Sequence, residues 1–161
     1  MYLLDTAVLW ALREARERNG AEGLASWASD IPPSSMFLSV VSLMELEGGI
    51  SRLERRDKSV GASARSWLTT QLRSAFDSRV LPIDAAVADR AGKLGYADAR
   101  DGLLAATALE HGMTLVTRET AAFKMGRVRT LNPWTYRPEA RAMDWEDGSL
   151  TGSVWLKSLF R

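Results

Sequence analysis

Short apolar segments alternate with amphipathic helical segments along most of this chain, and that alternation restricts its fold more than any other feature. The apolar segments cover residues 2–4, 36–41, 80–83, 113–116 and 127–131. A strand, a helix and a second strand in succession usually build a parallel sheet covered by helices. The sequence therefore predicts an α/β fold with a mainly parallel, doubly wound sheet. Pro82 places segment 80–83 at a sheet edge, because proline cannot donate to a strand ladder.

The stretch from Arg100 to Glu119 is the most informative part of this pattern. Its apolar residues recur on one helical face, Gly112 suits the position after a helix end, and segment 113–116 suits a buried strand. Asp101 lies three and four residues before Leu104 and Ala105, so it is predicted to project from the same face in the first turn. The alternative is that Asp101 only caps the helix or favours its dipole.

Polar residues beside apolar ones set the other predicted helix boundaries. Thr6 is predicted to cap a first helix, and Ser42 to open another directly after strand 36–41. A further amphipathic helix is expected over 67–76. Asp84 is assigned as a helix cap and Asp98 as a loop residue. Two further acids, assigned to exposed helix faces, are Glu47 and Asp89.

Composition excludes several classes of protein. The 161-residue chain has no cysteine and one histidine, which excludes thiolate or histidine-rich metal sites. Its net charge of +1 is not that of a strongly basic nucleic-acid binder. It has no apolar run long enough for a membrane span and no signal-peptide pattern, so no membrane association and a cytoplasmic location are expected. One domain over 1–134 is predicted, followed by an extension of different character over 135–161.

Acidic residues follow the predicted strands at the end of the sheet where α/β proteins form their sites. Asp5 follows the first strand, Glu45 the second and Glu119 the strand at 113–116, while Asp101 begins the central helix. Such acids would repel one another without a neutralising cation, and oxygen ligands suit Mg²⁺ or Mn²⁺. The sequence thus suggests an acidic site that activates water for phosphodiester cleavage.

Each acid also has a purely structural interpretation. Glu45 could complete a capping box with Ser42, and Asp5 could cap the first helix in place of Thr6. Glu119 could be an ordinary loop residue. These alternatives stay open at the level of sequence.

The motifs together resemble a known family, the PIN-domain ribonuclease toxins of bacterial VapBC-type toxin–antitoxin pairs. The similarity extends over residues 1–134 and rests on four stretches in order: 2–6 (YLLDT), 39–46 (SVVSLMEL), 101–109 (DGLLAATAL), and 111–118 (HGMTLVTR) together with 132–134 (NPW).

This resemblance implies a three-layer α/β/α sandwich and Mg²⁺- or Mn²⁺-dependent endonucleolytic cleavage of RNA. The family's acids correspond to Asp5, Glu45 and Asp101, and Thr117 matches a polar residue near the metal. It further implies a cognate antitoxin protein as partner and a homodimer. Substrate contacts are expected from Thr6, Thr117 and Arg118, the last to the RNA backbone.

Two positions and the long segment after Trp134 depart from the family pattern and motivate a second hypothesis. Ala7 stands where the family usually has asparagine, and Ala122 where it has a fourth acid. Glu119 is expected to supply the missing carboxylate from three residues earlier. The second hypothesis is that Glu119 does not replace this acid, and that the chain is a weakly catalytic PIN domain that binds an antitoxin-like partner or nucleic acid. An aspartyl-phosphate phosphatase is disfavoured, because its second aspartate would fall at Ala7.

Overall fold

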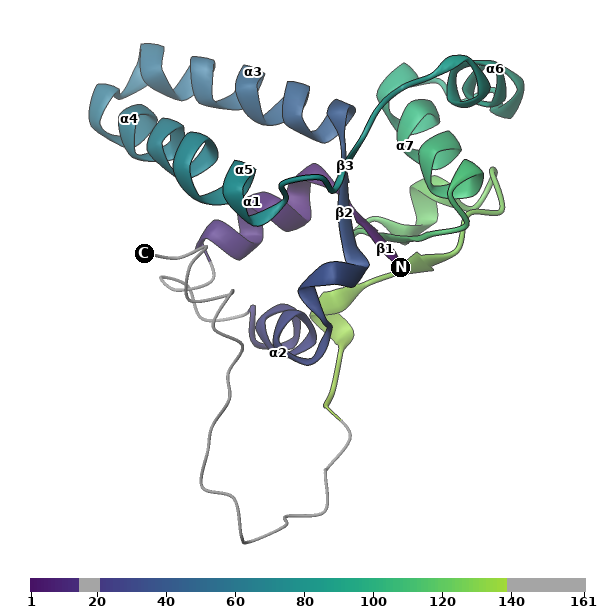
Figure 1. Ribbon diagram of the computed structural model, residues 1–161, viewed down its shortest axis with the longest axis horizontal. Coiled ribbons are helices and arrows are strands. Elements are labelled where there is room, and N and C mark those ends of the chain that lie inside the picture. The colour runs from purple at the N-terminus through teal and green to yellow at the C-terminus, as the bar shows by residue number, and fades with distance from the viewer. Residues whose placement is uncertain (15–20, 139–161) are drawn as a thin grey trace, which may run out of the picture.

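The computed structural model describes residues 1–14 and 21–138, and a five-stranded sheet forms its centre. The strand order is β3-β2-β1-β4-β5, and all neighbouring strands pair in parallel (Figure 1). The predicted α/β fold with a parallel sheet is confirmed, and so is the edge position of the strand before Pro82. The strands are β1 (Tyr2–Leu4), β2 (Met36–Ser39), β3 (Val80–Leu81), β4 (Thr114–Val116) and β5 (Thr130–Leu131).

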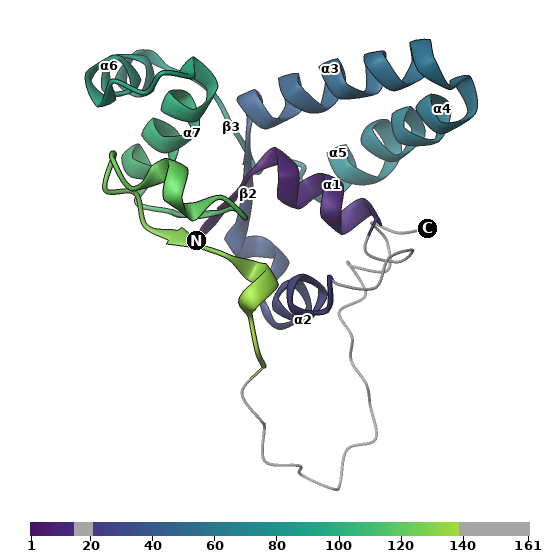
Figure 2. The same cartoon turned by 180° about the vertical axis from the view of Figure 1, so that it is seen from behind.

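Successive residues of the central strands point to opposite faces of the sheet, and a separate core forms on each face. Leu4 and Val116 pack with α1 to α5, whereas Leu3 and Leu115 pack with α7. Figures 1 and 2 show α1, α3 and α4 on one side of the sheet and α6 and α7 on the other. This is the predicted α/β/α sandwich. The helices are α1 (Thr6–Glu14), α2 (Glu22–Asp30), α3 (Val40–Arg56), α4 (Lys58–Ser66), α5 (Arg73–Ala75), α6 (Ala85–Leu94) and α7 (Ala99–Glu110).

The boundary between β2 and α3 lies earlier than the sequence predicts. β2 ends at Ser39, whose hydroxyl accepts a hydrogen bond of 3.2 Å from the Val41 amide and so caps α3. Ser42 is buried within α3 and donates to the Leu4 carbonyl at 3.3 Å. The prediction that Ser42 opens this helix, and with it the capping box with Glu45, is therefore wrong.

Other boundaries differ for local reasons. Asp98 is the N-cap of α7, not a loop residue, because its carboxylate accepts from the Arg100 amide at 2.8 Å. β5 begins only at Thr130, since Arg127 has a φ of 54°, outside the extended region. The helix expected over 67–76 has a π-helical turn at Trp67–Leu72 before α5. Asp84 caps α6 as predicted, and Gly112 follows α7 with a φ of 60°.

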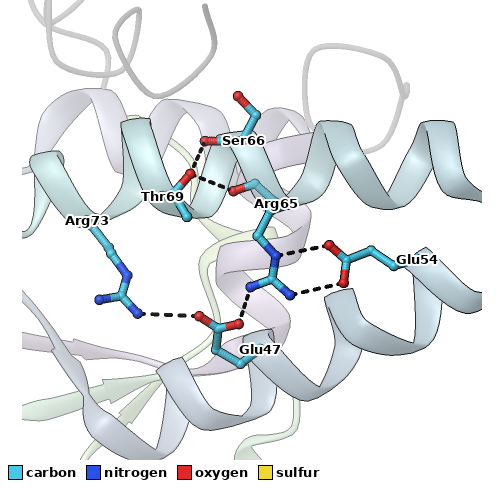
Figure 3. Close-up of polar contacts among 6 residues, drawn as sticks. All are labelled: Glu47, Glu54, Arg65, Ser66, Thr69 and Arg73. Atoms are coloured by element: carbon cyan, nitrogen blue, oxygen red, sulfur yellow. Dashed lines mark hydrogen bonds and ion pairs between the residues drawn. The ribbon is translucent and has the colours of Figure 1, made fainter.

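Helices α3 and α4 form a hairpin held by an ionic cluster (Figure 3). The Arg65 guanidinium donates to both carboxylate oxygens of Glu54, at 3.0 and 3.1 Å, and also to Glu47. Arg73 lies 3.3 Å from the same Glu47, which is thus not the free surface charge that the sequence suggests. Gly61 permits the close approach, because a Cβ there would lie 2.5 Å from the Glu54 Cα atom. The cluster therefore holds α3 against α4.

Most of the predicted extension lies outside the described residues. The predicted extension over 135–161 is described only as far as residue 138. Within this part, the Tyr136 hydroxyl donates to the Asp30 carboxylate at 2.9 Å. Within residues 1–14 and 21–138, the helices are all too short or too polar to cross a membrane.

Candidate functional site

A cavity of about 530 Å³ opens at the carboxyl end of β1 and β4, where α1, α3 and α7 converge. Every site residue predicted from the sequence lines it. Its lining consists of Asp5, Thr6, Ala7, Trp10, Glu45, Gly49, Arg52, Asp101, Thr117, Arg118, Glu119, Ala122 and Phe123. Segments far apart in the sequence therefore meet at one place, as expected for a site at the carboxyl ends of parallel strands.

Asp5 lies at the junction of β1 and α1. Its carboxylate accepts a hydrogen bond of 2.8 Å from the Thr117 hydroxyl, and the Thr6 and Ala7 amides of the first turn of α1 lie near enough to lower its pKa. The capping alternative is thus partly correct, because the carboxylate lies near the first amides of α1. Burial raises the pKa of Asp5 above its usual value, the hydrogen bonds oppose this rise, and the nearby charge of Glu45 adds to it.

Glu45 projects from the second turn of α3 and has two partners. The Thr6 hydroxyl donates to its Oε2 atom, and the Arg100 Nη1 atom lies 3.4 Å from its Oε1 atom. Thr6 begins α1, but its hydroxyl serves Glu45 and does not cap the helix as predicted. The carboxylate is therefore fixed from two sides.

Asp101 lies in the first turn of α7, three residues after the cap. Because Asp98 caps the helix, the alternative role of Asp101 as a cap is wrong. Burial is the main cause that raises the pKa of Asp101, and the charges of Asp98, Asp5 and Glu45 raise it further. The nearby Arg100 acts in the opposite direction. Asp5, Glu45 and Asp101 therefore form one electrostatically coupled group, which we call the acidic triad.

The segment after β4 forms another wall of the cavity. Thr117 is buried, and its hydroxyl also accepts from the Glu119 amide at 3.1 Å. The Arg118 guanidinium lies 5.4 Å from the centre of the Trp134 ring, in a cation–π arrangement. Glu119 is exposed and lines the cavity beside Ala122, the position where the family pattern has an acid.

Five residues at or beside the site were missed from the sequence. Trp10, Gly49, Arg52 and Phe123 line the cavity, and Arg100 pairs with Glu45. The spacing held a signal for three of them. Trp10 is four residues after Thr6, while Gly49 and Arg52 are four and seven residues after Glu45, so each shares a helical face with a predicted site residue.

The donor chemistry of the acidic triad suits a divalent cation. Carboxylate oxygens are preferred ligands of Mg²⁺ and Mn²⁺. Burial is the main cause that raises the pKa values of Asp5 and Asp101, the neighbouring carboxylates raise them further, and a cation would offset both effects. Among the described residues, no group of three or more acidic or histidine side chains is already arranged to hold a metal. The Glu45 carboxylate is instead engaged by Thr6 and Arg100.

Known proteins are similar to this chain in both sequence and fold. A profile of the PIN domain matches residues 2–128. Toxin FitB of Neisseria gonorrhoeae is 31% identical over 142 residues, which cover 83% of this chain and 99% of FitB. VapC ribonuclease Y4jK of Sinorhizobium fredii is 29% identical over 145 residues, covering 83% of this chain and 98% of the relative.

A solved structure, FitAB bound to an IR36 DNA fragment, superposes with a TM-score of 0.74 at 29% identity. The match covers 85% of this chain and 98% of the solved one. Together with the profile match over most of the chain, this likeness of sequence and fold establishes the family. The chain belongs to the PIN-domain family.

Proposed function

We propose that this chain is the toxin of a type II toxin–antitoxin pair and that it cleaves RNA as a divalent-cation-dependent endoribonuclease. One observation carries the proposal: Asp5, Glu45 and Asp101, from three separate elements, line one cavity in a PIN domain. The relatives add support, because one is a toxin and another is a VapC ribonuclease.

The acidic triad would hold Mg²⁺ or Mn²⁺ through its carboxylate oxygens. When bound, such a cation supplies Lewis-acid chemistry, lowering the pKa of a water molecule and stabilising negative charge on the leaving 3′ oxygen. The protein's own part is orientation. Thr117 holds the Asp5 carboxylate at 2.8 Å, and Thr6 holds Glu45. Arg118 and Arg52, both exposed at the cavity, are placed to contact phosphates of the RNA.

Glu119 is proposed as an assisting carboxylate. It lines the cavity beside Ala122, and a glutamate side chain is long enough to compensate for the acid that Ala122 lacks. The Thr117 hydroxyl accepts from the Glu119 amide, which links the backbone of Glu119 to the residue that orients Asp5. Glu119→Gln should therefore weaken cleavage without abolishing it.

The proposed partners are an antitoxin protein and a second copy of the chain. FitB is a toxin, and it has been solved as FitAB on DNA, which supports a DNA-binding antitoxin here as well. The homodimer and the cytoplasmic location remain predictions from the sequence.

Cleavage of total cellular RNA by the purified chain tests the proposal. We expect cleavage with Mn²⁺, none with EDTA, and a loss of at least about a hundredfold in Asp101→Asn, the size of effect expected for a group that acts on the transition state. The matched control is Asp89→Asn, an exposed acid on α6, which should cleave like the wild type. No cleavage by a folded sample free of antitoxin would favour the alternative of a binding module.

A further inference from the structure

The indole of Trp10 stands beside the acidic triad without belonging to it. Trp10 lies on α1, four residues after Thr6, and lines the same cavity as Asp5 and Arg52. The side chain is half-buried, unlike the large core residues Trp27 and Trp67, which are 1% and 5% exposed. Part of an aromatic surface is thus presented where the substrate would lie.

The ring is held in place by its neighbours. Trp67 stacks on it with ring centroids 5.9 Å apart and an interplanar angle of 28°. Gly49 of α3 fits against its edge, because a Cβ at this position would lie 3.1 Å from the Trp10 Cζ2 atom. The Arg13 guanidinium lies 5.8 Å from the Trp10 ring centre and 5.9 Å from that of Trp67. These contacts restrain the Trp10 ring, so ordering it for a ligand should cost little entropy.

The charges around Trp10 indicate what such a surface would bind. Arg52 and Arg118 are exposed cations of the cavity. A divalent cation bound at the acidic triad, as proposed above, would also attract phosphate. A ligand with a flat apolar part and neighbouring anionic groups matches this combination. A nucleotide of single-stranded RNA has both, since its base stacks on aromatic rings and its phosphates pair with arginine.

We propose that Trp10 is a nucleobase-stacking platform, on which one base next to the scissile phosphate packs against the indole. The inference rests on the proposed ribonuclease function and adds to it a positioned base subsite. Stacking on an aromatic ring tolerates every base, so the platform sets where the strand lies without reading its sequence. The structural alternative is that Trp10 only covers Trp67 and the core of α1 and α3.

A cleavage assay on a defined RNA oligonucleotide separates these interpretations. The site cleaved by the wild-type chain with Mn²⁺ is mapped first, and oligonucleotides with one abasic ribonucleotide at each flanking position are then compared. We expect one abasic position to lower kcat/KM by about fivefold to a hundredfold, mainly by raising KM. If no RNA is cleaved at all, the proposed function itself fails, which is a distinct result.

Two variants of Trp10, combined with the abasic oligonucleotide, test whether the indole and the missing base act on the same contact. Trp10→Leu keeps apolar bulk without an aromatic face, and it should lower kcat/KM for intact RNA as much as the abasic site does, with no further loss when the two are combined. Trp10→Phe, which keeps an aromatic face, should retain most of the wild-type kcat/KM for intact RNA. Additive losses, or an abasic scan with no position above twofold in the wild type, would overturn the proposal, and the scan decides even if Trp10→Leu does not fold. If no abasic position lowers kcat/KM but Trp10→Leu weakens antitoxin binding, the proposal is also overturned. The Trp10 surface would then bind a peptide segment of the antitoxin.

Discussion

The Thr117 hydroxyl donates a 2.8 Å hydrogen bond to the Asp5 carboxylate across 112 positions of sequence. Thr117 follows β4 and Asp5 follows β1, and Tyr2 to Leu4 pair in register with residues 114–116. The bond is thus a direct consequence of strand order. It fixes one oxygen of the acid that lies deepest in the acidic triad.

Removing this hydroxyl should both destabilise the fold and disturb the site. Thr117→Val keeps the shape of a buried side chain but leaves a carboxylate oxygen without its donor, so we expect a loss of about 1–3 kcal/mol in the free energy of unfolding. Urea denaturation measures this loss. Thr69→Val is the control, because that exposed hydroxyl bonds only to carbonyls one turn earlier, and its effect should stay within about 0.5 kcal/mol. Equal effects of the two variants would contradict the role given to Thr117.

The raised pKa values of Asp5 and Asp101 predict a pH dependence of stability without metal. Between its ordinary pKa and its raised folded-state pKa, each carboxyl binds more protons when folded, so its contribution to stability falls as the pH rises through this range. Above the folded-state pKa the full penalty is present. Asp101→Asn should therefore raise Tm at pH 7 in EDTA, with a gain that disappears toward pH 3.

Thermal denaturation over this pH range provides the check. Asp89→Asn, which removes an exposed acid from α6, should leave Tm within the error of the wild type at every pH. A gain for Asp101→Asn that persists unchanged at low pH would show that its cause is not the titration of this carboxyl.

Arg100 should compete with a divalent cation for Glu45. It lies 3.4 Å from the Glu45 carboxylate and is anchored by Asp98, so Arg100→Gln removes a positive charge from the acidic triad. We expect Mn²⁺ to bind about two- to fivefold more tightly, the range of an exposed ion pair. Arg90→Gln is the matched control, since it breaks an ion pair with Glu110 and does not line the cavity. Weaker Mn²⁺ binding in Arg100→Gln would contradict the competition.

The α3–α4 hairpin should depend on Gly61. A Cβ at this position would lie 2.5 Å from the Glu54 Cα atom, a contact with backbone that no rotamer change relieves. Gly61→Ala should cost about 1–3 kcal/mol in unfolding free energy. Gly92→Ala, on the exposed face of α6 with nothing within 4 Å, should instead stabilise by up to about 1 kcal/mol. The same sign for both variants would refute the close packing.

The parallel sheet and the convergence of the acidic residues on one cavity could both be predicted from the sequence, because both follow from the order of the strands. Asp5 and Asp101 reach the same cavity through strand topology alone. The partner of Asp5 follows from the same topology, but the Arg100 partner of Glu45 was not predictable in this way. Arg100 is held by Asp98, which caps α7, and a sequence pattern does not choose between two aspartates three residues apart.

The misplaced boundary at β2 has a comparable cause. The run Val40-Val41 has high strand propensity, but the Ser39 hydroxyl caps a helix at that point and the helix buries Val41. Tertiary packing outweighs local propensity there. The spacing of Trp10 places it on the helical face of Thr6, but the same spacing fits an ordinary core residue, and the cavity decides between the two interpretations.

Calorimetric titration of the wild-type chain with Mn²⁺ tests the central claim, that Asp5, Glu45 and Asp101 act together as a cation site. We expect saturable binding that weakens at least about tenfold in Asp101→Asn and is unchanged in Asp89→Asn. Binding must also raise the Tm of the wild type, since a ligand of the native state stabilises it. Absence of saturable binding, or equal binding by wild type and Asp101→Asn, would contradict the account.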